Sequence, residues 1–245
     1  AGRGGIGAVM GSKGIKAIVL DPAGTPVIRK PKNAEAFKAA SRAFAQGLSS
    51  HPVCGTGLPA YGTNVLVNIL NEAGGLPTKN FSVGRFEGAD KICAETMVEI
   101  QKRRGGNPTH GCHRGCIMKC SGICVDENGE FVSKQPEYET VWSHGAHCGV
   151  DDLDKIILCD RLEDDYGLDT IETGAALGVL MEAGALKWGD IDGIIAMIHE
   201  IGKGTPMGRI LGAGTATTAR CFGIERAPVV KGQAMPAYDP RAVKG

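Results

Sequence analysis

Four cysteines recur at a constant separation of four residues, namely Cys112, Cys116, Cys120 and Cys124. Gaps of three residues let a loop fold back so that its sulfurs approach one centre, and the glycines between them permit the positive φ angles that this requires. A site whose ligands are all cysteine thiolates is typical of an iron–sulfur cluster or of zinc. Structural zinc sites usually take their ligands from two pairs of closely spaced cysteines, and the two pairs lie farther apart in the sequence. The four cysteines here follow one another within a single short loop, which favours an iron–sulfur cluster. The alternative is a helix that buries four cysteines as small apolar residues.

The composition limits the kind of protein to which this loop belongs. Of 245 residues, 42% are hydrophobic and 22% are charged, which suffices for a sizeable core. The 27 Lys and Arg residues balance the 27 Asp and Glu residues, which excludes a chain-wide nucleic-acid surface. No apolar run approaches the ~20 residues of a membrane span. No secretion signal opens the sequence, so we interpret the nine cysteines as thiols or metal ligands and expect a cytoplasmic protein.

The elements that must position the cysteine loop are predicted to be mainly α-helical. A short strand is predicted over Lys16–Leu20 and a hairpin over 122–133, while 228–245 is typical of an extended connector. The predicted fold is mainly α, an irregular helical domain with a short β N-terminal stub and one β-hairpin. Apolar periodicity and capping residues predict helices over 33–47, 64–73, 88–104, 137–147, 151–166, 169–185, 191–202 and 206–222.

Three segments in register resemble the aldehyde ferredoxin oxidoreductase family of tungsten–pterin enzymes. They are the glycine-rich tract 2–13 (GRGGIGAVMGSK), the cysteine loop, and the pair formed by 136–140 (PEYET) and 164–170 (DDYGLDT). The tail 238–241 (YDPR) also resembles the family, so the likeness covers essentially the whole chain.

This resemblance implies a section of a longer protein with three parts. Residues 1–30 are expected to be the C-terminal end of an N-terminal β domain that binds the pterin. Residues 31–227 are expected to form the helical domain that binds the cluster and the pterin. Residues 228–245 are expected to be a connector toward a third domain.

The resemblance also implies a 4Fe-4S cluster held by Cys112, Cys116 and Cys120, with a fourth ligand from the third domain. The family spaces these cysteines as Cys-x2-Cys-x3-Cys, whereas both gaps here hold three residues. His113 therefore stands where the family places a cysteine. Cys112 is the predicted first ligand, and His113 and Cys124 are its alternatives.

A tungsten (or molybdenum) bis-pterin cofactor is the second group that the resemblance implies. Reduced pterins carry N–H groups that donate hydrogen bonds, and ionised carboxylates can accept those bonds. Glycine lets the protein backbone come close to such a cofactor. Taken alone, the DDYGLD motif is better explained as a helix that ends at a glycine and is followed by an Asp cap, an interpretation that is compatible with pterin binding. The residues implied to bind the pterin are Arg3, Gly4, Gly5, Asp164, Gly167, Leu168 and Asp169.

Glu139 matches the glutamate that the family places near the tungsten, 25 positions before Asp164. A carboxyl group in a dry pocket has a raised pKa, which suits proton exchange near neutral pH. We therefore predict that Glu139 is catalytic. The alternative is a solvated glutamate in the first turn of a helix, where the dipole favours acidic residues.

The implied function is oxidation of a small aldehyde to a carboxylic acid at the tungsten-bis-pterin site. Electrons would pass through the 4Fe-4S cluster to ferredoxin or a related electron-transfer protein. A homodimer is compatible with the family, and neither nucleic acid nor membrane is expected as a partner. Two alternatives stay open: a non-catalytic helical module stabilised by an iron–sulfur cluster or zinc, and an inactive apo fragment of the enzyme.

Two histidines and the remaining thiols carry weaker signals. His144 and His147 lie three residues apart on one side of a predicted helix, as a metal-binding pair would, but a packed or hydrogen-bonded role is favoured. The cysteines expected to be inert in apolar surroundings are Cys54, Cys93, Cys159 and Cys221.

Overall fold

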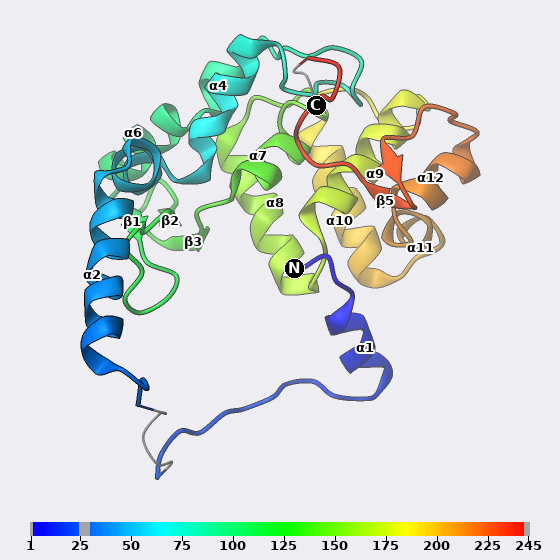
Figure 1. Ribbon diagram of the computed structural model, residues 1–245. Helices are drawn as coiled ribbons and strands as arrows, with labels where there is room; N and C mark the ends of the chain where they lie inside the picture. The colour runs from blue at the N-terminus through cyan, green and yellow to red at the C-terminus, as the bar shows by residue number, and fades with distance from the viewer. Residues whose placement is uncertain (1, 25–29, 243–245) are drawn as a thin grey trace.

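The computed structural model describes residues 2–24 and 30–242, and its helices confirm the mainly α fold (Figure 1). Residues 1, 25–29 and 243–245, which belong to the predicted first and third parts, lie outside this description. None of the described helices combines the length and apolar character needed to span a bilayer. The helical bundle consists of α7 (Tyr138–His144), α8 (Leu153–Tyr166), α9 (Thr170–Glu182), α10 (Ile191–Lys203), α11 (Pro206–Gly212) and α12 (Thr215–Phe222).

Capping residues set where the helices of the bundle begin and end. Asp152, Asp169 and Asp190 accept backbone N–H groups at the starts of α8, α9 and α10. Gly167 and Gly204 adopt left-handed conformations at the ends of α8 and α10. Helix α9 packs against α7 and α12, while α10 packs against α8 and α11. These boundaries agree with the predicted ones to within a turn, because caps act locally.

Two predicted helices are each divided in two. The segment 88–104 forms α5 (Ala89–Ile92) and α6 (Ala94–Arg104), because Cys93 between them has an extended backbone. The segment 206–222 forms α11 and α12, because Gly214 has a φ of +93° and precedes a new helix. An apolar pattern can continue across such breaks, so periodicity alone did not locate them.

The cysteine loop is mounted on a three-stranded antiparallel sheet. Strands β1 (Asn107–His110), β2 (Ser121–Val125) and β3 (Phe131–Lys134) lie in that order. The β2–β3 pair is the predicted hairpin, and Asp126 Oδ1 accepts the N–H of Glu130 across its turn. Strand β1 was not predicted, although it supports the start of the cysteine loop.

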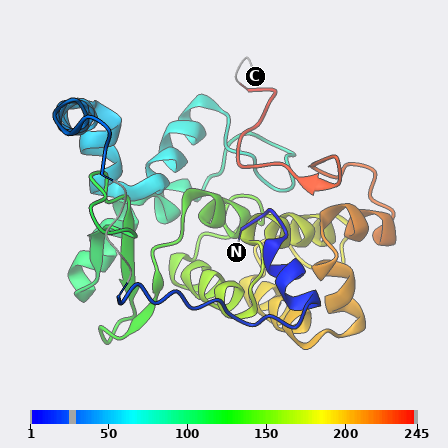
Figure 2. The ribbon, with the colours of Figure 1, turned by 60° about the horizontal axis from the view of Figure 1, so that its bottom comes forward.

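The two ends of the chain differ most from prediction. The predicted strand over Lys16–Leu20 is extended, but it pairs with no strand of the described residues, and Leu20 is 87% exposed. A strand needs a neighbour to satisfy its backbone groups. The tract before it forms helix α1 (Ile6–Ser12), which lies beside the bundle (Figure 2), so residues 2–24 contain no β stub. In the predicted connector, β4 (Val229–Val230) and β5 (Gln233–Ala234) form a small hairpin.

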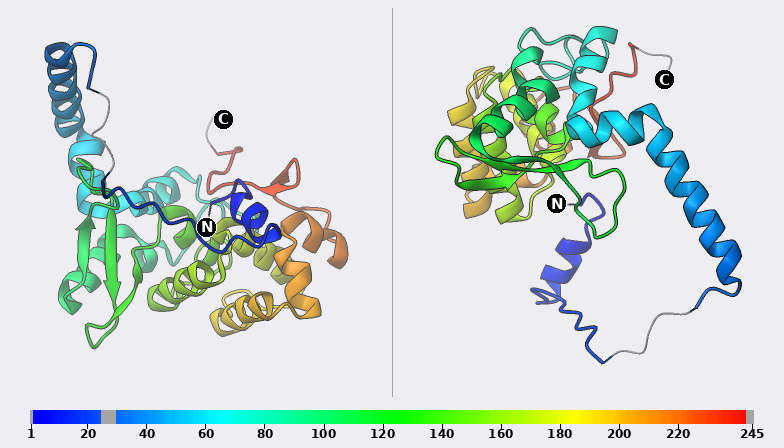
Figure 3. Two further views of the ribbon diagram at one scale, coloured as in Figure 1. Left: turned by 90° about the horizontal axis from the view of Figure 1, so that it is seen from below. Right: turned by 90° about the vertical axis from the view of Figure 1, so that its left-hand side faces the viewer.

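Helix α2 (Ala34–Ser50) projects away from the rest of the molecule (Figure 3). Its N-cap is Asn33, as predicted, and the Asn33 side chain accepts the N–H of Ala36. The apolar face of α2 is nevertheless exposed, at 62% for Phe37 and 67% for Phe44. Four short helical elements lie between α2 and α5. They are the π-helix η1 (Pro52–Gly57), α3 (Leu58–Tyr61), the 3₁₀-helix η2 (Gly62–Val65) and α4 (Leu66–Ala73).

The core is centred on Trp142 of α7. Its indole Nε1 donates to the carbonyl oxygen of Pro77 at 2.6 Å, and its ring centroid lies 4.8 Å from that of His147. His147 packs against Gly178 of α9, where any Cβ would overlap the imidazole. Burial lowers the pKa of His147 to about 3, so the ring is neutral. The packed role predicted for His147 is the observed one.

His144 has a different neighbour from His147. It is fully buried, and its Nε2 lies 3.1 Å from Glu163 Oε1. Burial acts to lower the pKa of His144, but the Glu163 carboxylate more than offsets this, so the pKa is raised. This pair joins α7 to α8, in agreement with the predicted hydrogen-bonded role.

Gly178→Ala tests the packing of α9 against α7. Alanine in a helix is normally more stable than glycine by about 1 kcal/mol, but here the new methyl group would displace the His147 ring. We expect the free energy of unfolding in urea titrations to fall by about 1–3 kcal/mol. The control is Gly47→Ala in exposed α2, where a Cβ meets open space, and it should be neutral or stabilising. Equal effects of the two substitutions would contradict the packing described.

Candidate functional site

The DDYGLD motif forms the turn between α8 and α9. Gly167 ends α8 with a φ of +70°, and the N–H of Leu168 donates back to the carbonyl oxygen of Glu163 at 2.8 Å. Asp169 then caps α9, and its Oδ1 accepts the N–H groups of Ile171 and Glu172. The second oxygen of Asp169 is left for a partner from elsewhere in the chain. The capping interpretation of this motif is therefore correct, and it leaves a binding role open.

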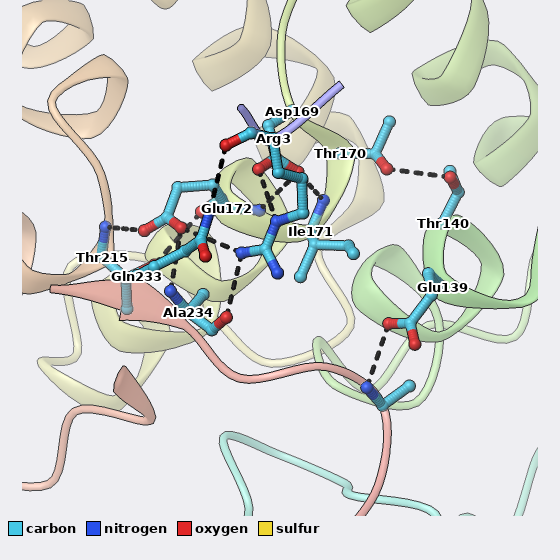
Figure 4. Close-up of polar contacts among 11 residues, drawn as sticks. Arg3, Glu139, Thr140, Asp169, Thr170, Ile171, Glu172, Thr215, Gln233 and Ala234 are labelled. Atoms are coloured by element: carbon cyan, nitrogen blue, oxygen red, sulfur yellow. Dashed lines mark hydrogen bonds and ion pairs between the residues drawn. The ribbon is translucent and has the colours of Figure 1, made fainter. Parts of the chain in front are cut away.

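Arg3 is the partner that reaches this turn from the N-terminal tract (Figure 4). Its Nε donates to Asp169 Oδ2 at 2.7 Å, and its Nη2 donates to Glu172 Oε2 at 3.2 Å and to the carbonyl oxygen of Ala234 at 2.9 Å. All three charged side chains are about one quarter exposed or less. Arg3 thus joins three segments that are far apart in the sequence: the N-terminal tract, α9 and β5.

Glu172 holds the same junction from the opposite side, and the sequence analysis missed it. Its Oε1 accepts the N–H of Thr215 at 2.8 Å, and its Oε2 accepts the N–H of Ala234 at 2.9 Å as well as the Arg3 guanidinium. A signal was present, because Asp169 and Glu172 have the spacing of a capping box. Glu172 does not close that box but binds backbone groups of α12 and β5 instead.

A cavity of about 560 Å³ opens beside this junction. A Cβ added to Gly4, Gly5 or Gly167 would meet no atom within 4 Å, so the glycines leave an open backbone surface. A flat ring system could lie against that surface, with Arg3 and Asp169 at its edge. The lining residues are Gly2, Arg3, Gly4, Gly5, Ile6, Gly7, Ala8, Gly167, Asp169 and Gly212.

Asp164 and Leu168 lie at other places around the same turn. Asp164 does not line the cavity; its carboxylate pairs with Lys134 Nζ of β3 at 3.5 Å. Leu168 packs against the edge of the core. The structure therefore brings Arg3, Gly167 and Asp169 together, and directs the first aspartate of the motif toward the sheet.

Glu139 lies in the first turn of α7 and is not a fully solvated side chain. Its Oε2 accepts the N–H of Ala237 at 3.0 Å. Burial raises the pKa of Glu139, while the hydrogen bond from Ala237 and the charge of Arg3 act to lower it and Asp169 acts to raise it. The hydroxyls of Thr140 and Thr170, 2.9 Å apart, hold the start of α7 against the start of α9.

The predicted cluster ligands Cys112, Cys116 and Cys120 lie on the loop between β1 and β2. Cys112 is exposed and the other two are half-buried, whereas Cys124 lies within β2 and is fully buried. Burial raises the pKa of Cys124 to about 12, which makes it a poor thiolate. A core helix of four cysteines is thus excluded. In residues 2–24 and 30–242, no three His, Cys, Asp or Glu side chains are gathered closely enough to hold a metal ion.

The start of α7 carries two carboxyl groups, Glu137 and Glu139, in different surroundings. Burial raises the pKa of Cys120, and the Glu137 carboxylate raises it further, so Glu137 faces the loop. Glu137 also accepts the hydroxyl hydrogen of Thr63. Glu139, two residues later, accepts the N–H of Ala237 instead. The start of α7 therefore carries one carboxyl group near the cysteine loop and a second one against the C-terminal segment.

The described site thus combines a glycine-lined cavity beside a helical bundle with an accessible thiol loop in a mainly helical domain. The profile of the family described as "Aldehyde ferredoxin oxidoreductase, domains 2 & 3" matches residues 39–245. The chain belongs to the aldehyde ferredoxin oxidoreductase family, which confirms the resemblance seen in the sequence.

The relatives support this assignment along the whole chain. The tungsten-containing aldehyde ferredoxin oxidoreductase of Pyrococcus furiosus is 38% identical over 261 residues, covering 100% of this chain and 42% of the relative. The protein of the same name from Thermococcus kodakarensis is 37% identical over 263 residues, with the same coverage. This chain therefore spans less than half the length of these relatives.

Two more distant proteins are also similar to this chain, one in sequence and one in fold. The "aliphatic sulfonate oxidoreductase, WOR-like subunit" of Pyrococcus furiosus is 27% identical over 237 residues, covering 89% of this chain and 36% of that protein. The solved active site complex BamBC of benzoyl coenzyme A reductase superposes with a TM-score of 0.69 over 96% of this chain and 38% of that chain. At 19% identity, this second likeness shows a shared fold.

Glu172→Gln tests the junction at Arg3. The substitution keeps the shape but replaces one accepting oxygen with an NH₂ group, which would face the donors of Thr215, Ala234 or Arg3. We expect the free energy of unfolding to fall by about 1–3 kcal/mol in urea titrations. Glu99→Gln on the exposed surface of α6 is the control and should change stability little. A stability equal to that of the control would show that the junction is dispensable.

Proposed function

We propose that this chain supplies part of a tungsten-bis-pterin site and three thiolate ligands of a 4Fe-4S cluster in an enzyme that oxidises aldehydes to carboxylic acids. The observation that carries the proposal is the Arg3–Asp169 ion pair at the edge of the glycine-lined cavity. Glu139, half-buried and with a pKa raised by burial, supplies a carboxyl group whose pKa the charges of Arg3 and Asp169 also influence. The names of the relatives that match the entire chain support the same activity.

The cavity fits a pterin by its shape and its donor and acceptor groups. The open backbone at Gly4, Gly5 and Gly167 accommodates a planar ring, and Asp169 offers a carboxylate to its N–H groups. Arg3 balances the charge of Asp169 and can also contact an anionic group of the ligand. Leu168 completes the turn, and Asp164 fixes that turn to β3 through Lys134. In this proposal molybdenum is the alternative to tungsten.

The cysteine loop fits an iron–sulfur cluster by its donor set, and its thiols would have to come closer together to hold one. Cys112, Cys116 and Cys120 are thiols outside the core, within a short loop. Gly115 and Lys119 have φ angles of +84° and +46°, so the backbone reverses between successive cysteines. The complete protein would supply the fourth ligand.

The reaction converts RCHO and H₂O into RCOOH, two protons and two electrons. The tungsten-bis-pterin, when bound, supplies the two-electron oxidation of the aldehyde carbon. Glu139 Oε2 is held by the N–H of Ala237, so Oε1 is the atom that exchanges a proton with the reacting group. Its raised pKa lets this carboxyl carry a proton at a higher pH than an exposed glutamate would. A 4Fe-4S cluster held by Cys112, Cys116 and Cys120 would supply one-electron transfer to ferredoxin or a related carrier, so the electron pair would leave one electron at a time.

Glu139→Gln tests the catalytic role in the complete protein purified without oxygen. Glutamine keeps an acceptor for the N–H of Ala237 but cannot exchange a proton. We expect unchanged tungsten and iron contents and a kcat lower by about 10²- to 10⁴-fold, with loss of the wild-type pH dependence assigned to this group. Glu35→Gln, another first-turn glutamate, is the control and should retain activity. An unaffected kcat for Glu139→Gln would remove Glu139 from the mechanism.

Cys116→Ser tests the cluster ligands. We expect loss of most of the iron and of the absorbance near 400 nm, because a serine hydroxyl is a poor iron ligand. Cys221→Ser, which alters an exposed thiol on α12, should leave both unchanged. Equal loss in both variants would mean that the cysteine loop is misassigned. Zinc without pterin in the wild-type protein would instead support the non-catalytic module.

A further inference from the structure

The cysteine loop lies in a stretch of the chain without acidic residues. Between Glu99 and Asp126 the sequence contains no Asp or Glu, although the two charge types balance over the whole chain. The basic residues of this stretch are Lys102, Arg103, Arg104, His110, His113, Arg114 and Lys119. The last four flank the proposed cluster ligands.

The two permanent charges of the loop are exposed and uncompensated. Arg114 and Lys119 are both exposed, and neither forms a hydrogen bond or ion pair within the part of the chain that the structure describes. Two other cations near the sheet are paired: Arg104 binds Asp154 at 2.6 Å, and Lys134 binds Asp160 at 3.0 Å. The loop therefore carries positive charge that the described structure does not neutralise.

The acidic groups of the same sheet lie at its other end. In an antiparallel sheet, the β1–β2 loop and the β2–β3 turn leave from opposite ends (Figure 3). That turn carries Asp126, Glu127 and Glu130. Basic residues of α6 adjoin that turn, and Arg104 pairs with Glu127 at 3.6 Å, so the acidic end of the sheet is largely compensated. The loop with the thiols has basic residues and no acidic residue of its own, and a negatively charged partner is oriented toward it.

We propose that the basic loop around the cysteines, with Arg114 and Lys119 as its main contacts, is the docking surface for an acidic one-electron iron–sulfur carrier protein. This inference rests on the proposed function, because the carrier needs a redox centre beneath the loop. Each docked carrier is reduced by one electron without making or breaking a bond. Two carriers, docking in turn, take the electron pair released by one aldehyde.

Charge reversal at the loop tests this docking in the complete protein. The double variant Arg114→Glu, Lys119→Glu is titrated by calorimetry with an oxidised, recombinant acidic 4Fe-4S ferredoxin. At an ionic strength of about 0.02 M we expect the Kd of the double variant for ferredoxin to be at least about tenfold higher than that of the wild type. At about 0.3 M salt screens the charges, so the difference in Kd between the variant and the wild type should become much smaller. The milder variant Arg114→Gln, Lys119→Asn should show a smaller rise in the same direction.

Lys102→Glu, Arg103→Glu is the matched control. It makes the same change in net charge on exposed residues of the same stretch, but at the end of α6 rather than on the loop. We expect its Kd for the ferredoxin to stay within about twofold of wild type. Equal weakening by both double variants, or none by the loop variant, would overturn the proposal. A nucleic-acid oligonucleotide that binds the loop as tightly as the ferredoxin would also overturn it.

Two further measurements separate this proposal from the proposed function. In the single variant Arg114→Glu, which leaves Lys119 and its positive φ in place, the iron content and the rate of aldehyde oxidation with the small dye benzyl viologen should be unchanged, while the KM for ferredoxin rises. Loss of iron in both loop variants would assign these residues to cluster assembly and refute a docking role. A wild-type protein that binds ferredoxin but oxidises no aldehyde with the dye would refute the proposed function and leave docking supported.

Discussion

The carboxylate of Glu172 is the interaction on which the cavity side of this structure depends. It accepts hydrogen bonds from the backbone of Thr215 and Ala234 and from the side chain of Arg3, so one charged group holds α12, β5 and the N-terminal tract against α9. Hydrogen bonds to a charged acceptor are stronger than neutral ones, and leaving such donors without a partner is costly. The glycine-lined cavity exists because this junction keeps residues 2–8 beside the start of α9.

The start of α7 imposes a second constraint, because it serves two regions at once. Glu137 precedes α7 with an extended backbone whereas Glu139 lies in its first turn, and the two carboxyl groups have different partners. Glu137 faces Thr63 and the thiol of Cys120, whereas Glu139 faces Ala237 and Arg3. The buried contacts of Trp142 and the Thr140 hydroxyl hold this helix in place. The spacing between the two candidate cofactor regions is therefore set by a helix that the core immobilises.

Local chemistry explains why much of the fold was predictable. Helix starts at Asp152, Asp169 and Asp190 and the helix end at Gly167 follow from side-chain caps and left-handed glycine, which depend on neighbouring residues only. The helix breaks at Cys93 and Gly214 and the strand β1 were not predictable in this way. Those features depend on packing and pairing with distant segments, which periodicity does not contain.

By itself, the sequence determined the residue types that could do chemistry: thiols spaced along one glycine-containing loop, a carboxyl group ahead of a helix, and a capped turn between two helices. Only the tertiary structure decided which of them meet. It joined Arg3 to Asp169, added Glu172, directed Asp164 to Lys134 instead, and withdrew Cys124 into the core. The physical reason is that burial and charge pairing are properties of segments brought together from across the chain, whereas spacing and capping are properties of a single segment.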